Sequence, residues 1–557
     1  MKDLAASRLL GTYVLMAVSA VTLLVTPFNS LDPVSIPKLS LLIFVGFISI
    51  GLVSRTLYST DKRKYRTAAL LVFVFITHLT LVLLVDNRNF ALKFYGTSGR
   101  NTGYIAYVSL AFILLASLIA ANRELSGRFA KALCAMGFLM AGYGIAQSLG
   151  HNFYSFNYEY ASKVFSTFGN ANFHSAFMGI VAATALTLAV FSSLKLYLRL
   201  ALLTLVILAI YNVSISSQQG YLNFIAGSFA ALVIYLFQKK YTALGWATLI
   251  AFGLGVISVL LGILDKGPLV EAIYKSSLQA RGFYWRGALN IITHHPFFGV
   301  GMDGFGDWYR RSRSLEVAKF NPGIVANTAH NIPLDIGSSG GFPLLLLYLA
   351  IIGLAFISIF RVVKRQSEFD VYFAAMVAAW VAYQAQSLIS INQLGLGVWG
   401  WSLTGLLIGY EINTRDDNQI VKVKITGSTK FVSEKVSAGV LVITFVTSGI
   451  GLAIALPPYI AANKFYQALQ SGDANIIQPA AFLHPYDLNR FLYVAQILHA
   501  NKLEAQAIQV LREASKIYPD SFDIWSQWAS IQEATQADIA HAKSEMKRLD
   551  PYNPDLN

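Results

Sequence analysis

Charged residues are scarce in this chain, and cysteine is almost absent. Only 13% of the 557 residues are Asp, Glu, Lys or Arg, whereas 55% are hydrophobic. Soluble domains carry about 25% charged residues, so these charges are too few to cover a water-soluble protein of this size. The single cysteine, Cys134, lies inside an apolar run, which excludes an intramolecular disulfide and a cysteine-cluster zinc site. The scarcity of charge indicates that lipid surrounds most of the chain.

Nucleotide-binding and metal-binding motifs are missing as well. The sequence has no Walker A loop and no H-E-x-x-H zinc helix. Asp303 and Asp307 come nearest to a divalent-ion pair, but their spacing beside glycines is a weak match. We therefore expect no metal and no cofactor. The net charge of +14 is spread over short loops between apolar runs, which argues against a nucleic-acid partner.

Apolar runs long enough to cross a bilayer recur along the chain. A hydrocarbon core of about 30 Å needs about 20 apolar residues per helix, and we count about 13 such runs, with 12 or 14 left open where neighbours nearly touch. They fall near residues 9–27, 36–54, 67–86, 102–121, 129–149, 173–193, 197–214, 219–237, 242–264, 341–360, 370–390, 394–411 and 437–458. The sequence predicts an all-α fold, a polytopic transmembrane helix bundle.

Lysine and arginine alternate between the loops that join these runs. Every second loop is basic, for example 55–66, 123–131 and 415–435, and the loops between them are richer in Asn, Gly and Ser. The positive-inside rule makes the basic loops cytoplasmic, with the N-terminus inside and the C-terminus outside. The outer loop 265–339 is also basic, but long loops are exempt from the rule.

Four regions follow from this topology. Residues 1–264 hold the first nine spans, 265–339 form a long external loop with the candidate active site, 340–458 hold the last four spans, and 459–557 form an external helical domain. In that domain Pro485, Pro519 and Pro551 recur in similar settings at intervals of about 34 and 32 residues, and the tetratricopeptide repeat has a period of about 34 residues. We expect a short tetratricopeptide-like array there.

Polar residues gather in four segments on the predicted outer side, namely 95–103, 165–173, 214–220 and 281–330. Polar side chains at the lipid boundary usually face a cavity or a substrate, although a single Asn or Ser there is more often a helix cap. His330, at the mouth of a span, is the strongest candidate for general-base work near neutral pH. The plainer alternatives are a structural histidine and arginines that are merely solvated.

The order and spacing of these segments resemble the O-antigen ligase and O-antigen polymerase superfamily of bacterial membrane glycosyltransferases, which use lipid-linked glycans. The resemblance covers roughly residues 90–360. It rests on five motifs, which are Gly99–Gly103, Ser166–Asn172, Arg281 with Trp285, His295–Gly301, and Ala329–Leu334 with Gly337 and Gly341. Members with a tetratricopeptide tail are familiar, which agrees with the C-terminal pattern.

The resemblance implies metal-independent glycan transfer at the external face of the bacterial cytoplasmic membrane. The donor would be an undecaprenyl-phosphate-type lipid-linked glycan, and the acceptor a hydroxyl of a glycan, a lipid or a protein. His330 would activate that hydroxyl, and Arg281 would hold the carrier pyrophosphate. Gln219 stands where many members have a second arginine, so either Arg286 or Arg100 compensates or the donor differs. Asn172 and Asn331 complete the expected substrate-binding set.

Two other functions stay open. A transporter or flippase for the same lipid-linked intermediates would suit the membrane fold, but transporters usually have internal repeats and broken helices at the bilayer midplane. A scaffold that recruits a protein partner through the C-terminal repeats would explain the tail but not the loop motifs. Within the superfamily, ligases, polymerases and protein O-oligosaccharyltransferases share one pattern and differ in the acceptor.

Overall fold

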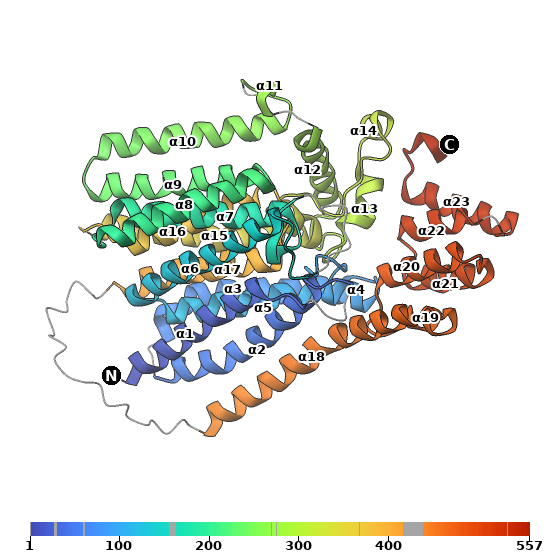
Figure 1. The fold of residues 1–557 in the computed structure, drawn as a ribbon, viewed down its shortest axis with the longest axis horizontal. Coiled ribbons are helices and arrows are strands. Elements are labelled where there is room, and N and C mark those ends of the chain that lie inside the picture. The colour runs from blue at the N-terminus through green and yellow to red at the C-terminus, as the bar shows by residue number, and fades with distance from the viewer. Residues whose placement is uncertain are drawn as a thin grey trace.

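The computed structural model of the chain describes residues 2–26, 31–59, 62–154, 163–268, 270–273, 276–366, 368–415, 438–531 and 533–556. Over these residues every regular element is a helix (Figure 1). Ten of the helices in these ranges are long and apolar enough to cross a membrane by length and composition. The predicted class, a polytopic α-helical membrane protein, is confirmed.

Each apolar run that the sequence analysis marked as a span coincides with a helix. These helices are α1 (Lys2–Leu23), α2 (Ser35–Ser59), α3 (Arg66–Val85), α5 (Tyr104–Ala120), α6 (Arg123–Ser148), α7 (Ala171–Phe191), α8 (Leu196–Ser216), α9 (Gln219–Gln238), α10 (Thr242–Ile263), α15 (Ile332–Arg365), α16 (Val371–Ser387), α17 (Leu394–Asn413) and α18 (Ala438–Ser471). Helices α5, α16 and α17 are not among these ten, and α5 and α16 are the shorter ones, with 17 residues each. Most residues of all three helices are buried by other helices.

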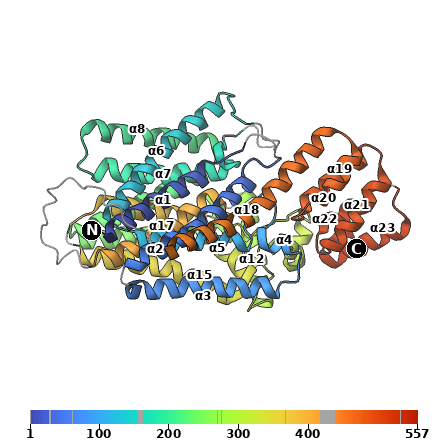
Figure 2. The same cartoon turned by 90° about the horizontal axis from the view of Figure 1, so that it is seen from below.

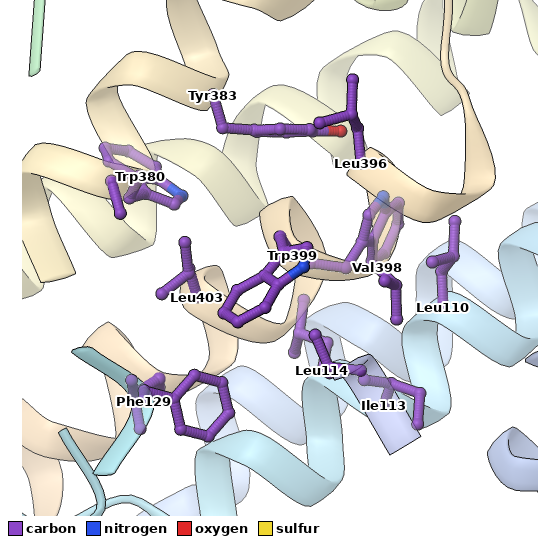
Figure 3. Close-up of a cluster of buried hydrophobic side chains, with 14 of the residues drawn as sticks. Leu110, Ile113, Leu114, Phe129, Trp380, Tyr383, Leu396, Val398, Trp399 and Leu403 are labelled. Atoms are coloured by element: carbon purple, nitrogen blue, oxygen red, sulfur yellow. The ribbon is translucent and has the colours of Figure 1, made fainter. Parts of the chain in front are cut away.

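The centre of the bundle lies where α5, α16 and α17 meet, and Figure 3 shows bulky side chains of all three helices converging there. Two buried indoles from this cluster donate hydrogen bonds between helices. Trp380 Nε1 donates to Thr404 Oγ1 and Trp399 Nε1 donates to Thr22 Oγ1, each at 2.9 Å. In lipid, packing and interhelical hydrogen bonds replace the hydrophobic effect as the attraction between helices.

Small residues let α17 approach α5 closely. Gly405 and Gly409 are one turn apart on α17, and a Cβ at either position would collide with a backbone carbonyl oxygen of α5, that of Leu114 or of Leu118. This spacing is the small-xxx-small arrangement of membrane helix pairs. The pair forms part of the rigid frame that carries the outer loops.

The outer loops form short helices at the end of the bundle that lies away from the N-terminus (Figure 1). They are α4 (Phe90–Tyr95), η2 (Ser166–Phe168), α11 (Val270–Ile273), α12 (Ser276–His294), α13 (Phe305–Ser312) and α14 (Leu315–Phe320). A further short helix, η1 (Lys62–Tyr65), directly precedes α3 and does not belong to this group. The boundary expected at residue 339 falls inside α15, which begins at Ile332 and bends at Gly341, a residue with φ of 72°. At this bend the Phe342 N–H donates to the Pro296 carbonyl at 2.7 Å.

A helical domain follows the last membrane helix without a break. Helix α18 runs on to Ser471 and is followed by α19 (Ala474–Ala480), α20 (Leu488–Ala500), α21 (Glu504–Ile517), α22 (Phe522–Ala529), α23 (Gln536–Leu549) and η3 (Pro554–Leu556). These helices lie beyond the end of the bundle that holds the outer loops (Figures 1 and 2). Trp525 and Trp528 are buried in their core. The packing of α20 on α21 and of α22 on α23 agrees with helix-pair repeats, and the tetratricopeptide assignment stays a prediction.

Candidate functional site

His330 lies in the loop that leads into α15, and its conformation is fixed from several sides. Its backbone has φ of 50°, a left-handed conformation that is uncommon outside glycine. Its N–H donates to Thr328 Oγ1 at 3.1 Å, and the neighbouring Ala329 N–H donates to Asp335 Oδ1 at 2.7 Å. The imidazole stacks on the ring of Tyr284 in α12, with centroids 5.6 Å apart. Strained backbone held in this way clusters at functional sites.

Asn331 ties this loop to two membrane helices. Its Oδ1 accepts from the Leu334 N–H at 3.0 Å and so caps α15, and its Nδ2 donates to the Leu388 carbonyl at the end of α16 at 2.9 Å. Both ends of the side-chain amide are therefore engaged by the protein. The sequence predicts that Asn331 binds substrate. The geometry instead favours a role for Asn331 in positioning His330.

Two arginines from separate elements act on His330 through their positive charges. Burial lowers the pKa of His330 to about 4, and the positive charges of Arg281 and Arg100 contribute to the same shift. Arg281 lies one turn before Tyr284 on α12, and burial lowers its pKa as well. At neutral pH a neutral imidazole thus lies near two guanidinium groups. This arrangement suits an anionic ligand, because its charge would offset both cations.

Arg100 is held in place by Asp303. The Arg100 guanidinium forms an ion pair with Asp303 Oδ1 at 3.3 Å and donates to the Asn327 carbonyl. Asp303 also accepts from the Thr97 N–H at 2.7 Å and from Thr102 Oγ1 at 2.8 Å. Its carboxylate therefore orders the whole glycine-rich loop that carries Arg100. From the sequence, Asp303 was expected only as a weak metal ligand, and this role was not predicted.

Arg286 lies on a different face of α12 from Arg281. Five residues correspond to a turn of about 140° around a helix, and the Arg286 side chain is exposed with its guanidinium 5.2 Å from the centroid of the Phe283 ring. The structure therefore does not bring Arg286 together with His330. Of the two arginines proposed to compensate for Gln219, Arg100 is the one whose charge acts on the histidine.

Gln219 belongs to a buried polar layer next to the His330 loop. It lies in the first turn of α9, where its Nε2 donates to Gln386 Oε1 of α16, and Asn223 Nδ2 donates to the same oxygen at 3.3 Å. Gln386 lies two residues before Leu388, which receives the hydrogen bond from Asn331. Gln219 therefore contacts the helix end that supports His330.

Asn172 lies in the first turn of α7, and the neighbouring Asn170 lies closer to Arg100. Asn170 accepts from the Asn172 N–H at 2.8 Å and, with Arg100, lines a cavity of about 170 Å³. Lys38 lines the same cavity, is fully buried, and donates to the carbonyls of Val21 and Thr22. Lys38 was not predicted as a site residue, although a lysine inside an apolar run often marks a functional site.

Within the part of the chain that the structure describes, no group of three or more His, Cys, Asp and Glu side chains is placed to hold a metal ion. The polar groups that converge are an imidazole, guanidinium groups and amides, contributed by α12, the loop that leads into α15 and the glycine-rich loop after α4.

A helical membrane bundle with a histidine among arginines at one end defines a class, the polytopic membrane proteins with a cationic site at the membrane surface. The comparison with known families is more specific, since residues 203–349 match the family model described as O-antigen ligase. The chain carries an O-antigen ligase domain, which confirms the resemblance and indicates a function in membrane glycan transfer. The family implies lipid-linked glycan substrates. No curated protein matches the chain.

The matched segment contains most of the candidate residues. Gln219, Arg281, Arg286 and the His330–Asn331 pair lie within 203–349, whereas Arg100 and Asn172 lie before it. Arg100 lies outside the matched segment, and its guanidinium charge acts on His330.

Proposed function

We propose that this protein transfers a glycan from an undecaprenyl-phosphate-type carrier to an acceptor hydroxyl without a metal ion. The reaction takes place at the external face of the bacterial cytoplasmic membrane, with the N-terminus in the cytoplasm and the C-terminal helical domain outside. The observation that carries the proposal is the position of His330, whose imidazole is held against Tyr284 and subject to the charges of Arg281 and Arg100. A donor pyrophosphate is an anion that would offset these two charges.

The proposed chemistry is a single displacement at the anomeric carbon. A ring nitrogen of His330 accepts the proton of the acceptor hydroxyl while the hydroxyl oxygen attacks the anomeric carbon of the donor glycan. The bond from that carbon to the pyrophosphate oxygen breaks, and the electron pair leaves with the pyrophosphate. Arg281 and Arg100 stabilise the negative charge that develops on this leaving group.

The electrostatics make His330 a better base once the donor is bound. In the free site the two guanidinium groups and burial depress the pKa of His330 to about 4, which leaves a weak base. A pyrophosphate bound between the same guanidinium groups offsets their charge, so the pKa of His330 rises toward its ordinary value near 6.5. Proton transfer is therefore favoured when the donor is in place.

The test is a transfer assay in vesicles with lipid-linked glycan extracted from cells that lack the gene. We expect His330→Ala and Arg281→Ala to abolish transfer, because they remove the base and a leaving-group cation. Arg286→Ala is the matched control, since it removes an exposed arginine from the same helix and should leave most activity. Wild-type transfer rates in both site variants would refute the proposal.

The material that accumulates in the deletion strain identifies the acceptor class. Single lipid-linked repeat units indicate a lost polymerase, and full-length lipid-linked chains indicate a lost ligase.

A further inference from the structure

A cavity of about 690 Å³ lies between the outer loops of the bundle and the C-terminal helical domain. Residues within 82–100, 298–310 and 325–327 form one side, and residues 488–489 and 516–523 of the C-terminal domain form the other. Ligand pockets typically have about 300–1,000 Å³, so this cavity has the size of a binding site.

The lining of this cavity combines hydrogen-bonding groups with aromatic rings. It includes Asn87, Asn489, Lys516, Asp523, Trp308 and Tyr518. Amides, carboxylates and ammonium groups can donate to and accept from sugar hydroxyls, and aromatic faces pack against the apolar faces of sugar rings. A purely apolar occupant would remove these polar groups from water without giving them hydrogen-bond partners.

The cavity is lined in part by residues close in sequence or charge to the candidate catalytic group, His330. Arg100 and Asn327 both line it, and the Arg100 guanidinium donates to the Asn327 carbonyl. Asn327 lies three residues before His330, and the charge of Arg100 acts on the His330 imidazole. A chain molecule in the cavity can therefore present its end near His330.

The C-terminal wall of the cavity is held firmly against the long outer loop. Arg313 and Asp550 form an ion pair at 2.7 Å with both side chains fully buried. Beside it, the Arg310 guanidinium lies 3.9 Å from the centroid of the Phe522 ring in α22. Because these contacts fix α22 and α23 relative to α13, the cavity is a defined feature of the fold.

We propose that this cavity binds the acceptor and that the acceptor is a carbohydrate chain, with the C-terminal helical domain as one wall of the acceptor site. This inference rests on the function proposed above and deepens it. The C-terminal domain selects the glycan that is extended or decorated, while the residues around His330 perform the transfer.

The test uses the full-length protein in vesicles and two variants of the C-terminal wall. Asn489 and Asp523 are exposed, so replacing them does not disturb the hydrophobic core of the domain. The double variant Asn489→Ala with Asp523→Ala removes two hydrogen-bonding groups, and Asn489→Trp fills part of the cavity. The control is Lys543→Ala, at an exposed position of α23 that does not line the cavity.

The transfer rate is measured first at varied acceptor concentration with saturating donor, and then at varied donor concentration with saturating acceptor. Both wall variants should raise the KM for the acceptor about tenfold, which is about 1.4 kcal/mol of binding free energy, and leave kcat and the donor KM unchanged. Glycan released by mild acid from the lipid-linked material should compete with the acceptor in the wild type and less well in the variants.

Two results would overturn the inference. An unchanged acceptor KM in both wall variants removes the cavity from acceptor binding. Transfer to a peptide or lipid that the free glycan does not inhibit shows that the acceptor is not bound as carbohydrate. Failure of the wild-type protein to transfer at all instead refutes the proposed function, and this outcome is distinguishable because it appears before any variant is compared.

Discussion

The buried ion pair between Arg313 and Asp550 is the contact on which the position of the C-terminal domain depends most. The guanidinium of Arg313 donates to both carboxylate oxygens of Asp550 at 2.8 and 2.7 Å, and it also donates to the carbonyl of Pro322 at 2.8 Å. Neither side chain of the pair is exposed. Asp550→Ala would therefore leave a guanidinium group buried without its main counter-ion.

The expected loss is large for a single substitution. Removing one partner of a buried ion pair typically costs about 3–5 kcal/mol, because the remaining charge is left in a medium of low dielectric constant. Each 1.4 kcal/mol is about a tenfold change in an equilibrium constant. Asp550→Ala should thus raise the population in which α22 and α23 separate from the long loop by about 100-fold or more.

Native-state proteolysis of the full-length protein in vesicles measures this opening directly. Cleavage of the C-terminal domain should accelerate about 100-fold in Asp550→Ala, provided that opening and closing are fast relative to cleavage. Glu513→Ala is the matched control because it breaks an exposed pair with Lys516 in the same domain, which should cost less than about 1 kcal/mol. Equal cleavage rates for the two variants would refute the argument that the buried pair holds the domain in place.

Three further predictions concern the site and the bundle. Arg100→Gln should move the acid limb of the kcat/KM profile from near pH 4 to higher pH, because one cause of the lowered His330 pKa is removed, and a limb that moves to lower pH would contradict this. Asn331→Ala should lower kcat about tenfold with little change in donor KM, because it removes two hydrogen bonds that position the His330 loop, and a change in donor KM alone would indicate a binding role. Gly405→Val should lower the yield of folded protein in size-exclusion chromatography, because its side chain would collide with the backbone of α5. The control for this variant is Val446→Ala at an exposed position of α18, and equal yields for the two would contradict the close approach of α17 and α5.

The membrane fold could be predicted because the bilayer imposes a length on each apolar run. The ends of the spans were harder to predict where the chain is polar and still helical. The segment from Ile332 to Ser339 was assigned to the outer loop, yet it forms the start of α15. The Asn331 cap and the contact of Ala329 with Asp335 stabilise this start, and neither follows from composition.

The candidate site could be predicted where its residues lie in recognisable motifs, and His330 and Arg281 are such residues. Residues whose partners are remote in sequence were missed. Asp550 is 237 residues from Arg313, and Asp303 is 201 residues from Thr102. A single sequence carries no signal for pairs of this kind, since each partner resembles an ordinary polar surface residue until the fold brings the two together.

The electrostatic coupling between His330 and the donor should also separate the acid limbs of the kcat and kcat/KM pH profiles. The acid limb of kcat/KM reports the free site and that of kcat reports the substrate-bound site. If the donor pyrophosphate lies between Arg281 and Arg100, it offsets the charges that lower the pKa of His330, so the kcat limb should lie at higher pH than the kcat/KM limb. Each unit of separation corresponds to about 1.4 kcal/mol of interaction between the donor and the protonated imidazole. Coincident limbs would place the donor phosphates elsewhere, and His330 would then act without the help of its substrate.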